Sequence, residues 1–248
     1  MRSDWTKRWL LPVAAAMLLF ATPALAGPTE DAVAEALKQD YSPALRNFVI
    51  LTMLSLIPVM MIGMTAFTRI IIVLALLRHA LGIPQTPPNS VIITLAVCMT
   101  YFTMSPVLDR MNHDAIAPYM SEQITAQQAV ELGSRPLREF MVSQTRESDL
   151  RAVIEMAKAP QPKTMEDIRF GHLVTAFLLS ELKTAFQIGF VIFLPFLLID
   201  LVVAAALMAL GMIMLPPTTI SLPLKILLFI LIDGWVLLSK ALLGSYWN

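Results

Sequence analysis

Long runs of apolar residues alternate with polar stretches along this chain. Four runs, at 47–77, 90–108, 181–214 and 224–243, hold few charged residues. A helix needs about 20 predominantly apolar residues to cross the hydrocarbon layer of a bilayer, and each run approaches or exceeds that length. The pattern therefore predicts an all-α membrane protein.

Residues that break helices divide these runs into two apolar helical hairpins. Gly82 and the prolines that follow it separate the first pair of runs, and Pro216 with Pro217 separates the second pair. A tandem proline cannot continue a helix, and it moves the preceding residue out of helical geometry. We expect the last helix to restart after Pro223 and to carry Asp233 near its middle.

One long polar stretch, 109–180, lies between the two hairpins. Half of all charged residues lie between Asp109 and Arg169. Thr125-x-x-Gln128 has the spacing of a capping box, and Gly133 is expected to end the helix that follows. The stretch has the periodicity of amphipathic helices. It predicts a helical module outside the membrane that packs on copies of itself or on partners.

The first 26 residues fit a secretory signal peptide. Basic residues precede a short apolar stretch at 10–21, and Ala24 and Ala26 fit the small-x-small pattern of a cleavage site before Gly27. An uncleaved membrane anchor is the alternative. Cleavage would leave the mature N-terminus outside the inner membrane.

The predicted organisation is a signal peptide at 1–26, a periplasmic leader at 27–46, a first apolar helical hairpin at 47–108, a periplasmic helical module at 109–180, and a second apolar helical hairpin with a methionine-rich turn at 181–248.

Composition supports the membrane class and excludes several others. Hydrophobic residues make up 57% of the chain and charged residues 15%, against about 25% charged in ordinary soluble proteins. Formal net charge is zero, and no basic face is present, which argues against a nucleic-acid partner. The three histidines, His79, His113 and His172, are scattered, and the single cysteine is Cys98. With no metal-ligand, nucleophile or phosphate-binding motif, we expect neither a metal, a cofactor nor an enzyme.

Several ionisable residues lie inside or beside the apolar runs. Such groups mark ion or proton pathways in some membrane proteins and join helices of an oligomer in others. Glu181 and Lys183 are two positions apart and do not face each other on a helix, so each needs a partner elsewhere, for example across a subunit boundary. The candidate inter-subunit or structural charges are Arg69, Arg78, Glu181, Lys183, Asp200 and Asp233.

Three methionines precede the Pro216-Pro217 turn. Met208 and Met212 are four residues apart and are expected to share a helix face, and Met214 continues toward the turn. Methionine is unbranched and adapts to irregular gaps. Around an axis shared by several copies, these side chains would form a deformable hydrophobic constriction. Ordinary lipid-facing or core residues are the alternative reading.

Several segments of the chain are long or unusual: Phe67–Ile70, Leu77–Gly82 followed by Pro87–Asn89, Met104–Val107, Glu181–Phe190, and Pro195–Val202 leading into Gly211–Pro217. Together they resemble the FliP family of flagellar export-gate proteins and its homologues in virulence-type type III secretion. The resemblance covers nearly the whole chain.

The resemblance implies a pore-forming core subunit of the flagellar type III protein export gate. Its place would be the bacterial inner (cell) membrane at the flagellar basal body, with much of the chain on the periplasmic side. The family forms a pentamer, joined by FliQ-like and FliR-like subunits, with FlhB-like and FlhA-like proteins beside it. The gate passes unfolded rod, hook and filament proteins. Use in an injectisome and a stand-alone ion or proton channel subunit are the alternatives.

The resemblance also implies roles for particular residues. It makes Met212 and Met214, with Met208 one turn earlier, a gasket around the closed channel. Ile213 stands where the family often has a third consecutive methionine. The resemblance further implies that Arg69, Glu181, Lys183 and Asp200 are contacts between subunits instead of a proton relay. It also implies that the apolar helices pack in the assembled gate more than they cross lipid one by one.

Overall fold

The computed structural model describes residues 43–160, 162, 164, 167–212 and 214–247. The expected cleavage site at Ala24, Ala26 and Gly27, most of the expected leader and Ile213 lie outside the described residues. The chain divides into two compact units, residues 1–54 and 55–248. Of the first unit, the described part is the beginning of helix α3.

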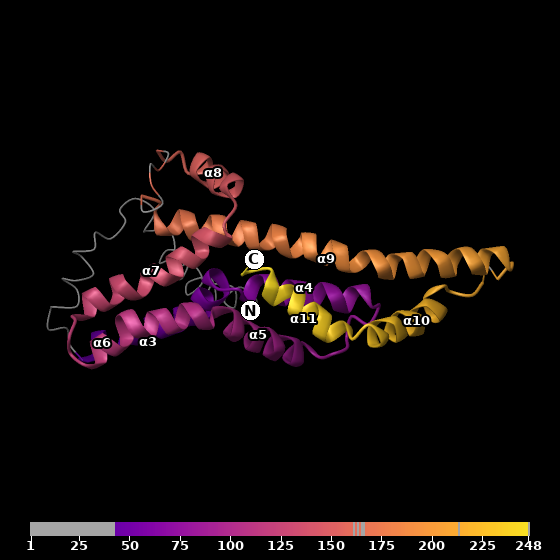
Figure 1. Cartoon of the computed structure of the whole chain (residues 1–248), viewed down its shortest axis with the longest axis horizontal. Helices are drawn as coiled ribbons and strands as arrows, with labels where there is room; N and C mark the ends of the chain where they lie inside the picture. The colour runs from indigo at the N-terminus through magenta and orange to yellow at the C-terminus, as the bar shows by residue number, and fades with distance from the viewer. Residues whose placement is uncertain (1–42, 161, 163, 165–166, 213, 248) are drawn as a thin grey trace, which may run out of the picture. The chain divides into compact units, whose positions relative to one another are not determined.

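The described part of the chain is helical and contains no strand, which confirms the all-α expectation (Figure 1). The elements are α3 (Pro43–Met64), α4 (Phe67–Ala80), α5 (Asn89–Met111), a π-helical turn (Asn112–Ile116), α6 (Ala117–Met120), α7 (Ala126–Gln144), α8 (Glu147–Met156), α9 (Phe170–Ala209), α10 (Thr218–Leu231) and α11 (Gly234–Gly244).

Helix α9 is the longest element, with 40 residues. It packs along α4, and it also contacts α7, α8 and α10. The sequence pattern predicted a boundary between 180 and 181, but α9 passes through it without a break. Ser180 and Glu181 are both fully buried in the helix, so their polarity reflects partners in the interior and does not mark the end of an element.

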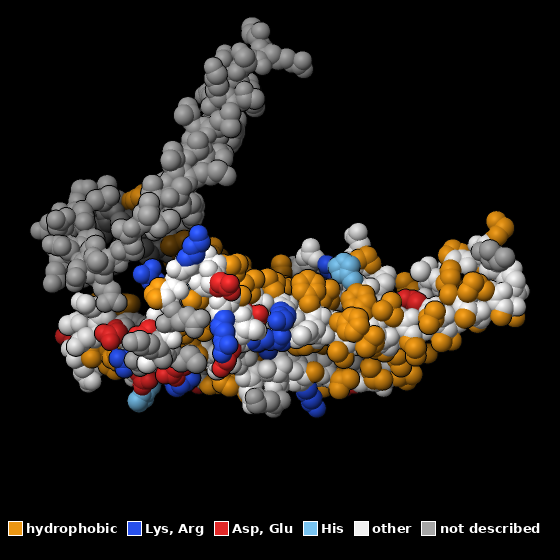
Figure 2. Space-filling view, turned by 90° about the horizontal axis from the view of Figure 1, so that it is seen from above, with side chains coloured by type: hydrophobic (Ala, Val, Ile, Leu, Met, Phe, Trp, Pro, Cys, Tyr) orange, Lys and Arg blue, Asp and Glu red, His pale blue; other side chains and the backbone are white. Residues whose placement is uncertain are grey.

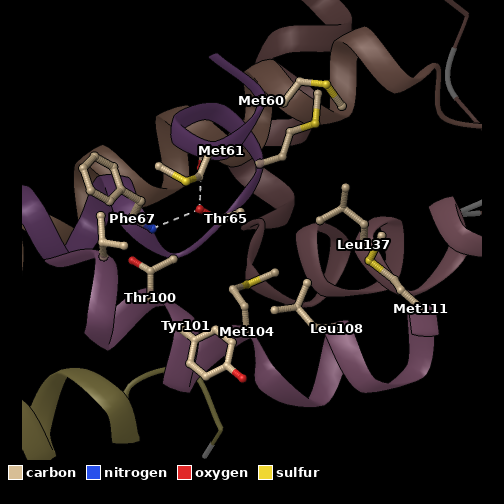
Figure 3. Close-up of a pocket in the computed structure, with 12 residues that line it drawn as sticks. Met60, Met61, Thr65, Phe67, Thr100, Tyr101, Met104, Leu108, Met111 and Leu137 are labelled. Atoms are coloured by element: carbon tan, nitrogen blue, oxygen red, sulfur yellow. Dashed lines mark hydrogen bonds between the residues drawn. The ribbon is translucent and has the colours of Figure 1, made fainter. Parts of the chain in front are cut away.

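The first apolar run, 47–77, is divided into two helices. Helix α3 ends at Met64 and α4 begins at Phe67. Thr65 Oγ1 donates to the carbonyl of Met61 and accepts a 3.3 Å bond from the Phe67 amide (Figure 3). Thr68 Oγ1 donates to the carbonyl of Ile62 at 2.6 Å. Threonine side chains therefore satisfy backbone groups that the break frees.

The last apolar run is also broken, contrary to the expected single segment. Helix α10 begins at Thr218, five residues before Pro223, and ends at Leu231. Helix α11 follows from Gly234, and the two helices are bent by 65°. Ile232 and Asp233 lie between them, and Asp233 has φ 53°, the left-handed conformation that normally ends a helix.

Within the polar module, helix α7 continues past the point at which Gly133 was expected to end it. The Thr125–Gln128 capping box is confirmed at the start of α7. Gly133 does not end that helix; it lies inside it and is buried. A Cβ at Gly133 would stand 3.3 Å from the Cβ of Ala115. Gly133 therefore permits the close approach of α7 to the π-helical turn.

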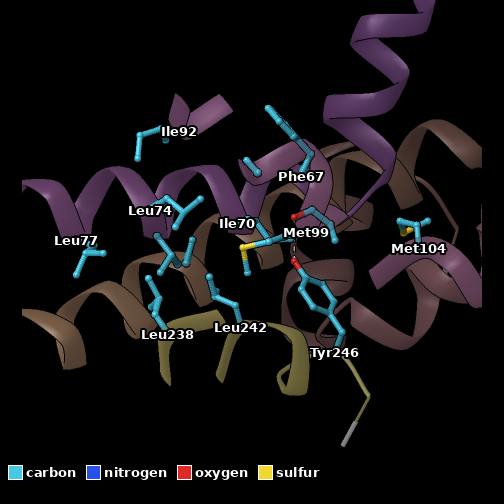
Figure 4. Packing of buried hydrophobic residues seen from close by; sticks show 14 of the residues in the cluster. Phe67, Ile70, Leu74, Leu77, Ile92, Met99, Met104, Leu238, Leu242 and Tyr246 are labelled. Atoms are coloured by element: carbon cyan, nitrogen blue, oxygen red, sulfur yellow. Dashed lines mark hydrogen bonds between the residues drawn. The ribbon is translucent and has the colours of Figure 1, made fainter. Parts of the chain in front are cut away.

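An apolar core joins α4, α5, α9 and α11 (Figure 4). Ile70, Leu74 and Leu77 of α4 point toward Leu238 and Leu242 of α11 in this core. Within the described residues, two helical stretches, 89–120 and 170–209, are long and apolar enough to cross a membrane, or up to four if each bent pair counts as one span. Figure 2 shows charged side chains gathered over the polar module, whereas the half toward the α9–α10 turn is mostly hydrophobic.

Candidate functional site

A buried ion pair joins α4 to α9. Arg69 is 2% exposed and Glu181 is 0% exposed. Arg69 Nε donates to Glu181 Oε2 at 3.1 Å, and its Nη2 contacts Glu181 Oε1. This is the two-pronged geometry that makes arginine–carboxylate pairs strong. The side chain of Arg69 is thus enclosed by protein and does not extend to an interface.

The C-terminal segment completes the surroundings of this pair. The Arg69 guanidinium carbon lies 3.8 Å from the centre of the Tyr246 ring. Tyr246 donates its hydroxyl proton toward Glu181 Oε2 at 2.8 Å. Arg69 Nη1 also donates to the hydroxyl of Ser245 at 3.0 Å. Figure 4 shows Tyr246 reaching toward the beginning of α4.

Gln144 closes the same cluster from α7. Its Oε1 accepts from Arg69 Nη2 at 3.2 Å, and its Nε2 donates to the Tyr246 carbonyl at 3.0 Å. Four segments distant in sequence therefore meet at one enclosed polar centre, the buried charge cluster: Arg69, Gln144, Glu181, Ser245 and Tyr246. Every group here has a partner, as a buried charge requires.

Lys183 takes a different partner from Glu181. Its Nζ lies 3.4 Å from Asp149 Oδ1, on α8, and the Lys183 side chain is 49% exposed. Ser180 Oγ donates to Asp149 Oδ2 at 2.8 Å. Burial by itself raises the pKa of Asp149, but the Ser180 hydrogen bond and the charges of Lys183 and Arg146 outweigh it and leave that pKa below its ordinary value.

Asp200 and Lys225 form a third ion pair, between α9 and α10. Lys225 Nζ donates to Asp200 Oδ2 at 2.6 Å and to the carbonyl of Ala80 at 3.3 Å. Lys225 is buried. The pair links the apolar helix before the methionine-rich turn to the helix after it, and both to the end of α4.

Arg78 and Asp233 complete the set of predicted charges. Arg78 Nη1 donates to Asn89 Oδ1 at 2.7 Å and to the Pro87 carbonyl at 3.2 Å, so it ties down the connection between α4 and α5. Asp233 is exposed. The structure thus supplies partners inside the chain for Arg69, Arg78, Glu181, Lys183 and Asp200.

The methionine-rich turn begins where α9 ends. Gly211 has φ 75°. Its amide donates to Met208 O at 3.0 Å, and the Met212 amide donates to Leu207 O at 3.0 Å. This pair of bonds is a Schellman motif, which requires a left-handed residue and therefore favours glycine. Met208 lies in the helix and Met212 beyond it, so the expectation that they share a helix face is wrong.

The methionines of this turn point away from the described core. Met208 is 67% exposed, Met212 45% and Met214 99%. Pro216 and Pro217 follow directly, and Pro217 precedes the first residue of α10. A long apolar helix therefore ends in a turn whose flexible hydrophobic side chains no described residue covers.

A second group of methionines was not among the site residues predicted from the sequence. Met60, Met61 and Met64 of α3 line an apolar groove of about 480 Å³ together with Met104 and Met111 of α5 (Figure 3). The signal was present as the spacing Met60-Met61-x-x-Met64, which places these side chains on neighbouring positions of one helix face. Among the residues that the structure describes, no three His, Cys, Asp or Glu side chains are grouped as metal ligands.

Comparison with known proteins decides the family. A family model described as FliP family matches residues 50–242. The chain belongs to the FliP family. Relatives named flagellar biosynthetic protein FliP include one from Pectobacterium carotovorum, 48% identical over 93% of this chain and 91% of its own length. Others are from Bacillus subtilis, 47% identical over 84% and 94%, and from Aquifex aeolicus, 44% identical over 82% and 86%.

Membership of the FliP family identifies a component of the flagellar export apparatus. It agrees with the apolar helices, two or more of which are able to span a membrane. The family match includes the buried ion pair at Arg69 and Glu181 and the whole methionine-rich turn. Both features therefore belong to the FliP part of the chain.

Proposed function

We propose that this chain is a pore-forming core subunit of the flagellar type III protein export gate in the bacterial inner membrane. The observation that carries the proposal is the exposed methionine-rich turn at the end of a 40-residue apolar helix. FliP-family membership supports it. In this role the subunit passes unfolded rod, hook and filament proteins and seals the channel when none is in transit.

The seal follows from the chemistry of methionine. Several copies around a common axis would bring their methionine-rich turns together. Thioether side chains are flexible and apolar, so Met208, Met212 and Met214 could repack around a passing chain and close again behind it. A narrow hydrophobic constriction excludes water and thereby blocks ions. Ile213 would contribute a further apolar side chain.

The exposed apolar surface supports assembly with further subunits. The second half of α9 leaves Phe190, Leu198, Leu201 and Val202 at least 60% exposed. A contiguous apolar surface of this kind marks a contact with protein or lipid. We propose that other copies of this chain, in a pentamer, and FliQ-like and FliR-like subunits cover it, with FlhB-like and FlhA-like proteins nearby.

The proposed orientation places the polar module in the periplasm. Cleavage after Ala26 leaves the mature N-terminus outside, and two passes of the first apolar hairpin return the chain there. The module's charged surface, over α7 and α8, suits an aqueous compartment. A stand-alone proton or ion channel has less support, because Arg69, Glu181 and Asp200 have partners inside the chain.

Solute leakage through the assembled complex tests the gasket. The variant Met212→Ala with Met214→Ala should let ions and small solutes pass through a membrane that holds the complex, because smaller side chains leave a wetted gap. The control replaces Met120 and Met156, two exposed methionines of the polar module, by Ala and should stay closed. Wild-type permeability in the turn variant, with normal complex yield, would overturn the gasket.

A further inference from the structure

Helix α10 is held to the rest of the unit along one narrow stripe. Its buried residues are Ser221, Lys225 and Phe229, at 1%, 7% and 7% exposure. They are four residues apart and lie on one face of the helix. Ile230 and Leu231, on the other side, are more than two-thirds exposed. Few contacts therefore oppose a movement of α10 away from α9.

The polar member of this stripe forms its strongest contact. Lys225 Nζ bonds to Asp200 Oδ2 at 2.6 Å, across to α9, and to the Ala80 carbonyl at 3.3 Å, at the end of α4. A short charged contact in apolar surroundings favours one arrangement strongly when it is made, and it leaves two unpaired charges when it is broken. The ion pair can therefore hold α10 in one position, the closed position, until it is broken.

Left-handed backbone marks both ends of the segment that contains α10. Gly211 has φ 75°, and a Cβ at that position would meet nothing within 4 Å. Asp233 has φ 53° and links α10 to α11, which are bent by 65°. Glycine adopts this conformation freely, and aspartate is one of the few other residues that visits it. Both positions are therefore points at which the chain can change direction.

Unfilled apolar space lies beside this bend. A groove of about 470 Å³ is lined from α9 by residues that include Ile188 and Pro195, and from the other side by Ile232, Gly234 and Leu238. Gly234 is directly against the Phe229 ring, where a side chain would collide. Close packing normally prevents rigid elements from shifting. The groove therefore gives α10 and α11 room to change their angle.

We propose that α10 is a hinged helix whose pivot is Asp233–Gly234 and whose closed position is held by the Asp200–Lys225 ion pair. This rests on the proposed function, because the end of α10 opposite the pivot carries the methionine-rich turn. A 14-residue helix is about 21 Å long. A rotation of about 30° would move the turn by about 10 Å, roughly the diameter of a helix. Opening of the ion pair would thereby withdraw Met212 and Met214 of one subunit from the channel, while Met208 stays on α9.

Distance measurement between two spin labels tests the hinge directly. The labels are attached at Thr219→Cys, near the moving end of α10, and Phe186→Cys, on α9; both positions are exposed. Cys98→Ser removes the exposed native thiol. In the full chain in detergent, the starting protein should give one narrow distance population. Lys225→Met should add a second population at a different distance, displaced by up to about 10 Å, the movement of the free end of α10.

Two further variants complete the test. Asp233→Gly keeps the ion pair and relaxes the pivot, so it should broaden the same distance distribution, and it decides the matter if Lys225→Met does not fold. Lys240→Met removes an exposed lysine of α11 and should leave the distribution narrow. A narrow, unshifted distribution in both Lys225→Met and Asp233→Gly would overturn the hinge. If the variant Met212→Ala with Met214→Ala does not leak while the displaced population is present in Lys225→Met, the result contradicts the gasket and leaves the hinge standing.

Discussion

Tyr246 donates its hydroxyl to Glu181 across 65 residues of sequence, at 2.8 Å, while its ring covers the guanidinium of Arg69. The second-last described residue of the chain thus completes the surroundings of an ion pair that joins α4 to α9. Tyr246 is 3% exposed and stacks on Phe140 of α7. The C-terminal segment is therefore part of the folded core.

Removal of the Tyr246 hydroxyl should weaken the fold. Tyr246→Phe keeps the ring and leaves one oxygen of Glu181 with a single donor, so we expect a loss of about 1.5–3 kcal/mol, the range for a hydrogen bond to a charged group. Thermal unfolding of the full chain in detergent measures it. Trp247→Phe, at a half-exposed neighbouring position, is the control. Equal unfolding of Tyr246→Phe and wild type would show that the bond contributes nothing.

Glu181 and Lys183 should differ sharply in their response to truncation. Glu181→Ala leaves Arg69 buried without its counter-ion and should cost about 3–5 kcal/mol, with a matching loss of complex yield. Lys183→Ala breaks a pair that is half exposed and should cost less than about 1 kcal/mol. Denaturation midpoints and yields of the purified complex compare the two. Similar effects for both variants would mean that contacts outside this chain dominate one of the sites.

Two glycines of α9 should respond in opposite directions to alanine. A Cβ at Gly189 would overlap the Leu76 side chain of α4, the helix that α9 packs against, so Gly189→Ala should destabilise the fold by about 1–3 kcal/mol. A Cβ at Gly171 meets nothing within 4 Å, and Gly171→Ala should be neutral or stabilising by up to about 1 kcal/mol. Thermal unfolding of both variants checks the prediction, and a stable Gly189→Ala protein would contradict this packing of α9 on α4.

The ionisation of Asp149 should make the free energy of unfolding depend on pH below about pH 5. Its pKa in the folded chain is below the ordinary value of 3.8, so the folded state favours the charged carboxylate. The contribution is complete above about pH 5 and disappears as the pH falls through the folded-state pKa. The stability gap between wild type and Asp149→Asn should therefore close on acidification. Glu155→Gln, on the exposed part of α8, is the control, and a gap that stays constant down to about pH 2 would contradict the assignment.

The sequence by itself determined the class of the protein, the Thr125–Gln128 helix start and the position of the turn before α10. These features depend on local chemistry. A long apolar run crosses a membrane as a helix, and tandem proline ends a helix. The two residues of a capping box satisfy backbone N–H groups at the start of their own helix. The residues that matched the FliP family were also readable along the chain. The Schellman motif at Gly211, which separates Met212 from the helix face of Met208, was not predicted.

Only the tertiary structure decided which charges meet. Glu181 and Lys183 are near neighbours in sequence but take partners more than 30 residues away, on different helices. It also decided that α9 continues through residue 180 and that the last apolar run breaks at Asp233. A buried carboxylate is tolerated inside α9 because Arg69 and Tyr246, from distant segments, reach it. At Asp233 a left-handed residue divides a run whose composition favours one continuous helix.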